Sequence, residues 1–153
     1  MPALEMTNMV MVQDPNSGKV LIQDRVLSWR GPAFPGGHIE EDESFVDSEV
    51  KEETGLTVSH LHTCGVVHWL HPETYDRYLV FLYKTKDYSG ELIDETTEGK
   101  NCWVDVNEIW NMPTENSFLQ YLPMFLEGKY NEAFGDWRDL FISKAYVGRF
   151  RIF

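Results

Sequence analysis

The sequence predicts an α/β fold in which helices cover both faces of a mixed, curved β-sheet, that is, an α/β/α sandwich. Strand-like segments surround one acidic, helix-forming segment and do not alternate regularly with helices, which favours this arrangement over a pure antiparallel barrel. Hydrophobic residues make up 42% of the sequence and aromatic residues 14%, far more than a disordered chain carries. We expect a single domain, residues 1–153, that buries its core without disulfides or zinc.

Two strands are expected at the start of the chain. Residues 4–12 and 19–25 are rich in strand-forming residues, and the turn-forming segment 14–18 (Asp-Pro-Asn-Ser-Gly) lies between them. A β-hairpin is therefore predicted. Residues 26–37 contain five glycines and prolines, too many for a regular element, so we expect a loop there.

A helix and two central strands are expected next. Residues 44–54 are mostly polar and acidic with apolar residues interleaved, and Gly55 follows where a helix commonly stops. This pattern predicts a helix. Residues 57–70 and 78–85 are rich in β-branched and aromatic residues, which is typical of central strands.

The last third of the chain is predicted to be mainly helical. A polar segment, residues 87–100, precedes a short strand at 101–104. Residues 105–111 and 115–127 are expected to form helices, the second bent or interrupted at its internal proline. For residues 128–153 we expect only a helix that docks on the rest of the domain, followed by a tail without an assigned structure.

Charge and composition limit the classes of partner. The net charge is −12, from 25 acidic and 13 basic residues, and this field repels polyanions, so no nucleic-acid partner is expected. No apolar run approaches the roughly 20 residues of a membrane span, and residues 1–5 lack a signal pattern, so a cytoplasmic protein without membrane contact is expected. Cys64 and Cys102 lack metal-ligand spacing and are predicted to be reduced, buried thiols.

Three glutamates in the predicted helix form the main candidate site. Glu49, Glu52 and Glu53 stand at positions i, i+3 and i+4, so a helix places their carboxylates on one face. Like charges crowded in this way destabilise a helix unless a cation neutralises them, and Mg²⁺ prefers such oxygen ligands. The alternative is a solvated acidic helix face.

The surrounding residues resemble the Nudix hydrolase signature, which runs Gly, five residues, Glu, seven residues, Arg-Glu-aliphatic-x-Glu-Glu-x-Gly-aliphatic. Gly37 and Glu43 match its first glycine and glutamate, and residues 49–56 (Glu-Val-Lys-Glu-Glu-Thr-Gly-Leu) match every position after the arginine. The resemblance covers roughly residues 4–126. It implies a Nudix-type sandwich, and the small size of the chain favours the MutT-like branch.

The match departs from the signature at one place. Five residues, 44–48, separate the first glutamate from Glu49 where the family has eight, and Ser48 replaces the arginine. Three residues correspond to about 300° of rotation and about 4.5 Å of rise on a helix. Either the chain has a shortened helix and altered activity, or the sequence lacks three residues of the natural molecule. An intact-mass measurement against the expected 17.8 kDa separates the two explanations.

The resemblance also implies a metal site and a catalytic acid. Glu49, Glu52 and Glu53, with the main-chain carbonyl of Gly37, are implied to bind Mg²⁺, for which Mn²⁺ is a substitute. Water then attacks phosphorus while a carboxylate takes its proton. The implied base is Glu49, Glu52 or Glu98. Glu98 comes from a loop after the central strands, and the alternative for it is an ordinary loop acid.

Other residues are expected to bind the nucleotide. Arg25 and Arg30 are candidates for holding phosphate oxygens, with simple surface charge as the alternative. Asn8, Trp29 and Phe34 are candidates for base recognition, although aromatic residues belong more often to the core. Two further residues near the signature, Glu43 and His38, are expected to be structural.

The resemblance therefore implies Mg²⁺-dependent hydrolysis of a nucleoside diphosphate-linked substrate. The leading substrate is a nucleoside triphosphate, with an oxidised purine as one option, cleaved to monophosphate and pyrophosphate. ADP-ribose, dinucleoside polyphosphates and sugar nucleotides remain open, as does a homodimer. The alternatives are a non-catalytic Nudix-fold module that binds a nucleotide or a protein, and an acidic structural domain without a ligand.

Overall fold

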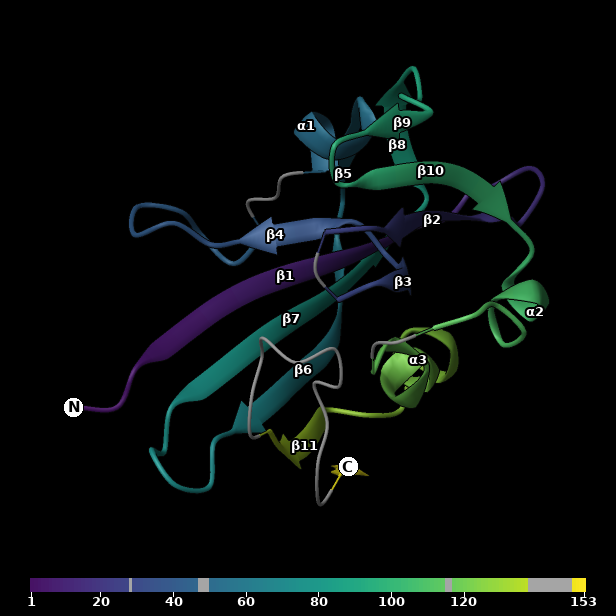
Figure 1. Ribbon diagram of the computed structural model, residues 1–153. Coiled ribbons are helices and arrows are strands. Elements are labelled where there is room, and N and C mark those ends of the chain that lie inside the picture. The colour runs from purple at the N-terminus through teal and green to yellow at the C-terminus, as the bar shows by residue number, and fades with distance from the viewer. Residues whose placement is uncertain (28, 47–49, 115–116, 138–149) are drawn as a thin grey trace.

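The computed structural model describes the chain except for residues 28, 47–49, 115–116 and 138–149 (Figure 1). Within the described residues it contains twelve strands and three helices. In chain order these are β1 Leu4–Val12, β2 Val20–Arg25, β3 Gly31–Ala33, β4 Gly36–His38, α1 Val50–Thr54, β5 Leu56–Ser59, β6 His62–Leu70, β7 Arg77–Thr85, β8 Asp87–Gly90, β9 Glu95–Thr96, β10 Gly99–Val104, α2 Val106–Ile109, α3 Phe118–Glu127, β11 Glu132–Asp136 and β12 Phe150–Ile152.

The largest sheet has the strand order β12-β11-β6-β7-β1-β4. β1 runs parallel to β7, and β11 runs parallel to β6, whereas the other neighbours are antiparallel. The predicted mixed sheet is therefore confirmed. A second, antiparallel sheet has the order β3-β2-β10-β9, and β5 pairs with β8.

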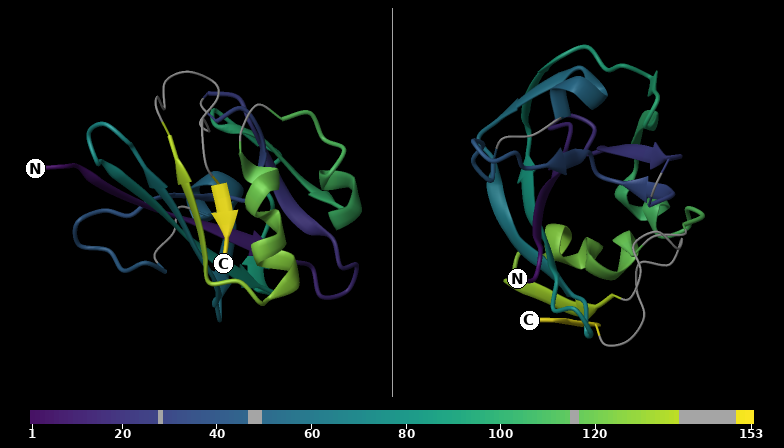
Figure 2. Two further views of the ribbon diagram at one scale, coloured as in Figure 1. Left: turned by 90° about the horizontal axis from the view of Figure 1, so that it is seen from below. Right: turned by 60° about the vertical axis from the view of Figure 1, so that its left-hand side comes forward.

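Helices lie on both faces of the large sheet, as predicted (Figure 2). Met9 and Met11 of β1 pack into a core cluster that also contains the buried side chains of α3. Val10 and Val12, which point to the opposite face, pack with Val50 of α1. The period-two alternation of β1 therefore separates the two helical layers.

The predicted β1–β2 hairpin is wrong. The turn itself forms, because the Gly18 N–H donates a 2.9 Å hydrogen bond to the Asp14 carbonyl. After a single bridge between Gln13 and Val20, however, β1 pairs with β7 and β4, whereas β2 pairs with β3 and β10. The two strands enter different sheets because each pairs over more residues with strands from elsewhere in the chain than with the other.

Several element boundaries differ from those expected. The expected loop 26–37 contains β3 and the start of β4, and the expected strand 57–70 is divided into β5 and β6 by His60, whose φ is 54°. The polar segment 87–100 contains β8 and β9. In the expected helix 44–54, the described helical part is only α1, and residues 44–46 are not helical.

The C-terminal elements also bring corrections. α3 continues through Pro123, so of the bend or interruption predicted there, the interruption does not occur. In the described parts of the tail, 128–137 and 150–153, the chain forms β11 and β12 and no docking helix. Cys64 is buried as predicted, but Cys102 is exposed, and both are free thiols. No helix in the described ranges is long and apolar enough to cross a membrane.

Candidate functional site

A cleft of about 330 Å³ opens at the N-terminal halves of β1 and β7. It contains five residues that the sequence singled out as nucleotide-binding or metal-binding candidates: Asn8, Arg25, Trp29, Phe34 and Gly37. Its lining consists of Glu5, Thr7, Asn8, Met9, Arg25, Trp29, Phe34, Gly36, Gly37, His38, Tyr78 and Val80. We refer to this space as the cleft.

The double glycine forms one wall of the cleft because β4 lies against β1. A Cβ atom on Gly36 would lie 2.0 Å from the carbonyl oxygen of Asn8, so this approach requires glycine. The Gly37 N–H donates a 3.4 Å hydrogen bond to Oδ1 of Asn8. The pairing thus fixes the start of the signature at the edge of the cleft.

Asn8 connects β1 to the loop that follows β4, residues 39–46, which we call the signature loop. The side chain of Asn8 is only 3% exposed, and its Nδ2 donates a 3.1 Å hydrogen bond to the Phe45 carbonyl. The Phe45 ring in turn stacks on Phe81 of β7, with centroids 4.1 Å apart. Asn8, expected to read a base, is therefore engaged in holding this loop.

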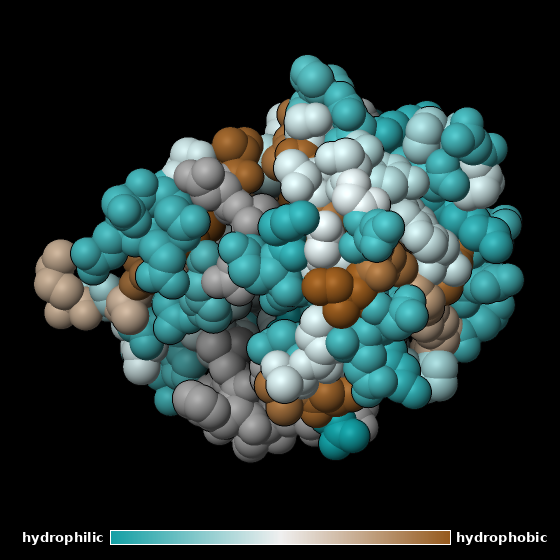
Figure 3. Space-filling model, turned by 90° about the horizontal axis from the view of Figure 1, so that it is seen from above, coloured by the Kyte–Doolittle hydropathy of each residue, from teal (hydrophilic) through white to brown (hydrophobic). Residues whose placement is uncertain are grey.

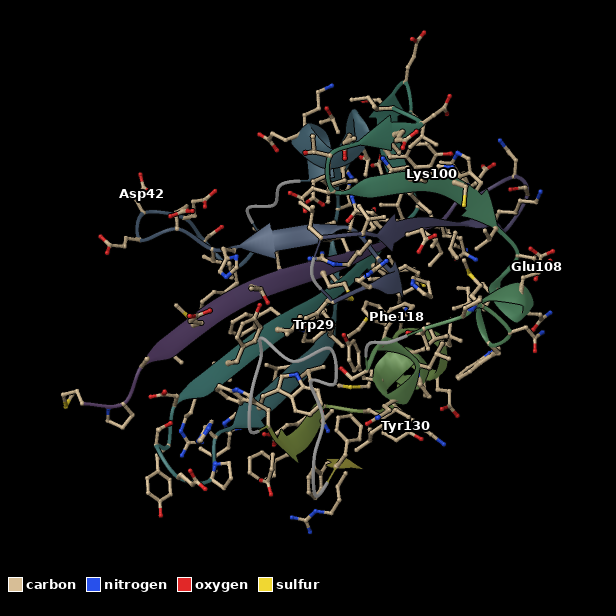
Figure 4. The ribbon with its side chains drawn as sticks, viewed as in Figure 1. Trp29, Asp42, Lys100, Glu108, Phe118 and Tyr130 are labelled. Atoms are coloured by element: carbon tan, nitrogen blue, oxygen red, sulfur yellow. The ribbon has the colours of Figure 1, made fainter. Side chains whose placement is uncertain are left out.

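The signature loop also stabilises itself, as expected for Glu43. The Glu43 carboxylate accepts a 2.8 Å hydrogen bond from the Glu40 N–H, and the Glu43 N–H donates to the Glu40 carbonyl. The loop projects from the body of the molecule, with Asp42 at its outer end (Figure 4). Glu43 therefore has a structural contact, whereas His38 is an exposed residue at the rim of the cleft whose Nε2 lies 3.5 Å from the Glu5 carboxylate.

Aromatic side chains form a second wall. Trp29 stacks on Tyr78 with centroids 6.5 Å apart, and Trp29 has a φ of 50°, which is rare for a bulky residue. Burial raises the pKa of the Tyr78 hydroxyl, and neighbouring Thr7 and Arg25 oppose that shift only in part. The cleft thus carries a hydroxyl that stays protonated beside a flat aromatic surface.

Phe34 occupies a different position from the one expected of a base-stacking residue. It is 1% exposed and packs edge-on against Phe118 and Phe125 of α3, with centroids 4.8 Å apart in both cases. Its ring belongs to the core because α3 covers it. It therefore supports the floor of the cleft and offers no open face to a ligand.

The two candidate arginines lie in neighbouring hollows. Arg25, at the end of β2, is half-buried and lines both the cleft and an adjacent hollow of about 330 Å³. Arg30 is exposed and lines the adjacent hollow only. Of the two, only Arg25 faces the space that also contains Gly37.

Helix α1 presents its two described glutamates differently. Glu52 is exposed, Glu53 is 9% exposed, and Glu49 lies outside the described residues. The surface seen from above, on the side of α1 and β10, is mostly hydrophilic (Figure 3). Glu52 is thus available to solvent, whereas Glu53 is turned into the protein.

The segment between β8 and β9 fixes the end of α1. Asn101 is 4% exposed, and its Nδ2 donates 2.8 Å hydrogen bonds to the carbonyls of Glu53 and Ile93. The Ile93 N–H donates to the Thr54 carbonyl, and Gly55, with φ of 80°, lies so close to this segment that a Cβ would be 2.4 Å from the Glu91 carbonyl. α1 therefore ends at a position set by a buried amide of β10.

Glu98 lies near Arg25 because β10 pairs with β2. Gly99 is the register partner of Arg25, and the Val26 N–H donates a 3.1 Å hydrogen bond to the Glu98 carbonyl. Glu98 is half-buried. The pairing brings the main chain of Glu98 to the arginine end of the cleft, although Glu98 does not line the cleft itself.

The predicted metal ligands are only partly described. Throughout the described ranges, no three acidic, histidine or cysteine residues gather closely enough to hold an ion. Glu52 and Glu53 do lie on a helix, as their spacing predicts, and the set of carboxylates with one carbonyl has the hard oxygen chemistry that Mg²⁺ requires. The donor set therefore suits a divalent ion, with Glu49 as its undescribed member.

Sequence reasoning missed Thr7 and Tyr78 as cleft residues. Tyr78 shares its sheet face with Val80, and Thr7 shares its face with Met9, so period-two alternation within each strand was the available signal. The parallel pairing of β1 with β7, which brings the two strands together, leaves no local trace in the sequence.

Comparisons with known proteins agree with this geometry. A family model described as the NUDIX domain matches residues 5–123. An uncharacterized Nudix hydrolase of Bacillus subtilis, YvcI, is 30% identical over 117 residues, covering 69% of this chain and 74% of the relative.

Solved structures show the same fold at low identity. The MutT protein of Bacillus halodurans matches with a TM-score of 0.73 at 20% identity, covering 97% of each chain. The MutT protein of Methanosarcina mazei Go1 gives 0.59 at 20% identity, covering 84% of this chain and 97% of that one. The NUDIX domain of Shewanella oneidensis NrtR, complexed with ADP ribose, gives 0.63 at 18% identity, covering 83% and 88%. Nudix hydrolases generally cleave nucleoside diphosphate-linked substrates with divalent metal ions, and this chain, with its MutT-like fold, belongs to that family.

Proposed function

We propose that the protein hydrolyses a nucleoside triphosphate to the monophosphate and pyrophosphate, with Mg²⁺ as cofactor. The observation that carries this proposal is that Gly37, Arg25 and the stacked pair Trp29 and Tyr78 line one cleft. The cleft thus offers both a cationic group and an aromatic surface. Its volume of about 330 Å³ is at the small end of ligand sites, which suits a single nucleotide.

Phosphate and base would contact different walls. The Arg25 guanidinium can donate two parallel hydrogen bonds to phosphate oxygens, which fixes both their position and their orientation. Trp29 and Tyr78 would support the base, because stacking on an aromatic face is favourable for any base. Asn8 and Phe34 would act indirectly, the first through the signature loop and the second through the floor of the cleft.

The metal would be held by Glu49, Glu52, Glu53 and the Gly37 carbonyl, and Mn²⁺ would substitute for Mg²⁺. When bound, the ion supplies a polarised phosphoryl group and a more acidic water molecule. The protein's own contribution is to hold the substrate and to accept a proton. The attacking water forms the new P–O bond, the bridging anhydride oxygen leaves with pyrophosphate, and a carboxylate takes the proton released by water.

Two described carboxylates are candidates for that proton acceptor, in addition to Glu49. Glu52 is exposed on α1, and Glu98 stands next to the register partner of Arg25. We propose that Glu52 binds the metal ion and that Glu98 accepts the proton from the attacking water. Glu98→Gln would then lower kcat with little change in KM, whereas Glu52→Gln would also shift the Mg²⁺ concentration needed for half-maximal rate to higher values.

The test is a Mg²⁺-dependent hydrolysis assay over a panel of nucleotides, including oxidised purines, ADP-ribose and sugar nucleotides, with detection of pyrophosphate. Glu52→Gln should lower turnover by about 100-fold or more, since it removes a charged ligand and keeps the shape of the side chain. Glu108→Gln, at an exposed position of α2 (Figure 4), is the matched control and should leave turnover unchanged. Wild-type turnover in Glu52→Gln would refute the role of Glu52.

A non-catalytic nucleotide-binding module is the second candidate. It is favoured by the short described helix α1 and by Ser48 in place of the signature arginine. The NUDIX domain of NrtR, which was crystallised with ADP ribose, is the comparison that suggests a ligand. Calorimetry that detects ADP-ribose binding, together with no hydrolysis of any nucleotide in the panel at saturating Mg²⁺, would favour this candidate over the enzyme.

We further infer that residues 1–153 act as one domain in the cytoplasm, where nucleoside triphosphates and Mg²⁺ are available. The net charge of −12 supports a small metal-bound anion as the ligand and not a nucleic acid. Gel filtration with light scattering would measure whether the protein is a homodimer.

A further inference from the structure

A second cavity, of about 670 Å³, lies at the C-terminal ends of β1 and β7. It shares no lining residue with the cleft, which uses the N-terminal halves of the same strands. Its lining combines cationic, polar and apolar side chains: Met11, Gln13, His60, His62, Lys84, Thr85, Lys86, Asp87, Phe125 and Leu126.

Lys84 occupies a position in β7 where the alternation calls for an apolar residue. Val80 and Leu82 point into the core on the α3 side of the sheet, and Lys84 continues this series with period two. Its register partners are Met11 in β1 and His62 in β6, so the three side chains form a row across the sheet. The row lines the same cavity as Phe125 and Leu126 in the last turn of α3.

Lys84 is a half-buried residue whose charge lies near the core. Burial raises the pKa of the nearby Cys64 thiol to about 11, and the charge of Lys84 opposes this shift. None of the ion pairs formed between described residues includes Lys84 or Lys86. The one acidic residue that lines the cavity, Asp87, interacts with His60.

A half-buried lysine can bury its apolar stem and keep its charged head exposed, so without a counter-ion the ammonium group is available to an anionic ligand. The chain has 25 acidic residues, so a carboxylate partner for Lys84 would be easy to supply. Instead, the cavity presents Lys84 and Lys86 together, beside the apolar surface of Met11, Phe125 and Leu126. Such an arrangement suits a ligand that has both an anionic group and an apolar body.

We propose that this cavity is a second ligand site, which binds a phosphate monoester with an apolar or aromatic body. Lys84 and Lys86 hold the phosphate, since two ammonium groups match its charge of nearly two and lysine serves as a point charge for phosphate. Met11, Phe125 and Leu126 contact the body of the ligand. The site does not depend on hydrolysis in the cleft.

The test is a titration of ¹⁵N-labelled protein with phenyl phosphate, followed by amide chemical shifts. The amides of the cavity residues, Gln13 and Leu126 among them, should shift with a common saturation curve. Lys84→Met and Lys86→Met, which keep the length of the side chain and remove its charge, should each weaken binding at least about fivefold. Lys100→Met, at an exposed position of β10 (Figure 4), is the matched control and should leave binding unchanged.

Two additional measurements test the contribution of each part of the ligand and check that the variant is folded. Inorganic phosphate and phenol, each corresponding to one half of the probe, should bind at least about fivefold more weakly than phenyl phosphate. Lys84→Met should leave the urea midpoint of unfolding at or above the wild-type value, because methionine keeps the apolar stem of this half-buried side chain, so a loss of binding in this variant does not reflect loss of fold. Shifts confined to the amides of the cleft, no shifts at all, or equal affinity in Lys84→Met and wild type would overturn the proposal.

Discussion

The Nδ2 atom of Asn101 donates a 2.8 Å hydrogen bond to the main-chain carbonyl of Glu53, which ties strand β10 to the helix that carries the signature glutamates. The same Nδ2 donates to the Ile93 carbonyl, also at 2.8 Å. One buried amide therefore holds the end of α1 and the segment that packs against it. The position of the glutamates depends on a residue far outside the signature.

Replacing Asn101 by alanine should destabilise the protein by about 2 kcal/mol, because two carbonyls lose their donor in a buried place. Urea unfolding followed by circular dichroism measures the change. Asn107→Ala, at an exposed position of α2, is the control and should change stability by less than about 0.5 kcal/mol. Equal stability of the two variants would contradict the structural role of Asn101.

Gly36→Ala should prevent β4 from pairing with β1, since the added Cβ would lie 2.0 Å from the Asn8 carbonyl oxygen. We expect a large loss of stability and of nucleotide binding. Gly128→Ala offers a comparison: its φ is 65° and nothing lies within 4 Å of the added Cβ, so only the backbone conformation opposes alanine, at a cost of about 1 kcal/mol. Thermal unfolding that ranks Gly128→Ala as the more damaging change would show that the approach of β4 to β1 is wrong.

Arg25→Met should weaken nucleotide binding about tenfold or more, because the variant loses a charge-assisted contact with phosphate. Arg30→Met, which changes an exposed arginine in the adjacent hollow, should leave affinity within about twofold. Isothermal calorimetry with a non-hydrolysable nucleoside triphosphate measures both. If Arg30→Met has the larger effect, phosphate binds in the adjacent hollow and not in the cleft.

Cys64 should resist alkylation at pH 8 because burial raises its pKa to about 11 and the thiolate is the reactive form. Cys102 is exposed and should react first, although burial and Asp24 also raise its pKa. Mass spectrometry of iodoacetamide-treated protein distinguishes the two sites. Modification of Cys64 before Cys102 in folded protein would contradict the burial.

The raised pKa of Cys64 also has a consequence for stability at high pH. The thiol has an ordinary pKa of 9.0, and it ionises more readily when the chain unfolds, so its contribution to stability is complete below about pH 9 and is lost as the pH rises toward about 11. Cys64→Ala should flatten this part of the stability profile, whereas Cys102→Ala should change it less. Urea midpoints measured between pH 8 and pH 11 test the difference.

The shortened signature leads to a prediction about activity. Inserting Ala-Ile-Arg after Ser48 restores the family's spacing and its arginine, so it should raise Mg²⁺-dependent turnover about 100-fold or more, since small misplacements of catalytic groups already have effects of that size. The comparison is between the chain as printed and the chain with the insertion, over the same panel of nucleotides. Equal and high activity in both would show that the short spacing is compatible with catalysis.

The residues of a segment were sufficient to predict some of the secondary-structure elements and not others. β1 and β7 were predicted nearly to the residue because both segments are rich in strand-forming residues. β3 and β4 were missed because glycine and proline suggest a loop, and their strand structure exists only through pairing with β2 and β1. The hairpin was wrong for the same reason: a turn sequence fixes where the chain reverses but not which strand becomes the neighbour.

In the site, too, some features were predictable from local sequence and others depend on distant contacts. The spacing of the glutamates placed Glu52 and Glu53 correctly on a helix, and the double glycine marked the edge of the cleft. The role of Asn8 in holding Phe45, and the burial of Phe34 beneath α3, depend on contacts between distant segments. Neither contact has a signature in the composition or the periodicity of its own segment.

The parallel pairing of β1 with β7 also constrains how the protein is made. Leu4 is the register partner of Arg77, so the first strand to leave the ribosome has no parallel neighbour until about seventy more residues have been synthesised. At about 5–20 residues per second, this wait lasts several seconds. During that time an apolar strand is exposed, and closing so long a loop is slow. Nascent chains halted before β7 should therefore be the species that chaperones bind most strongly.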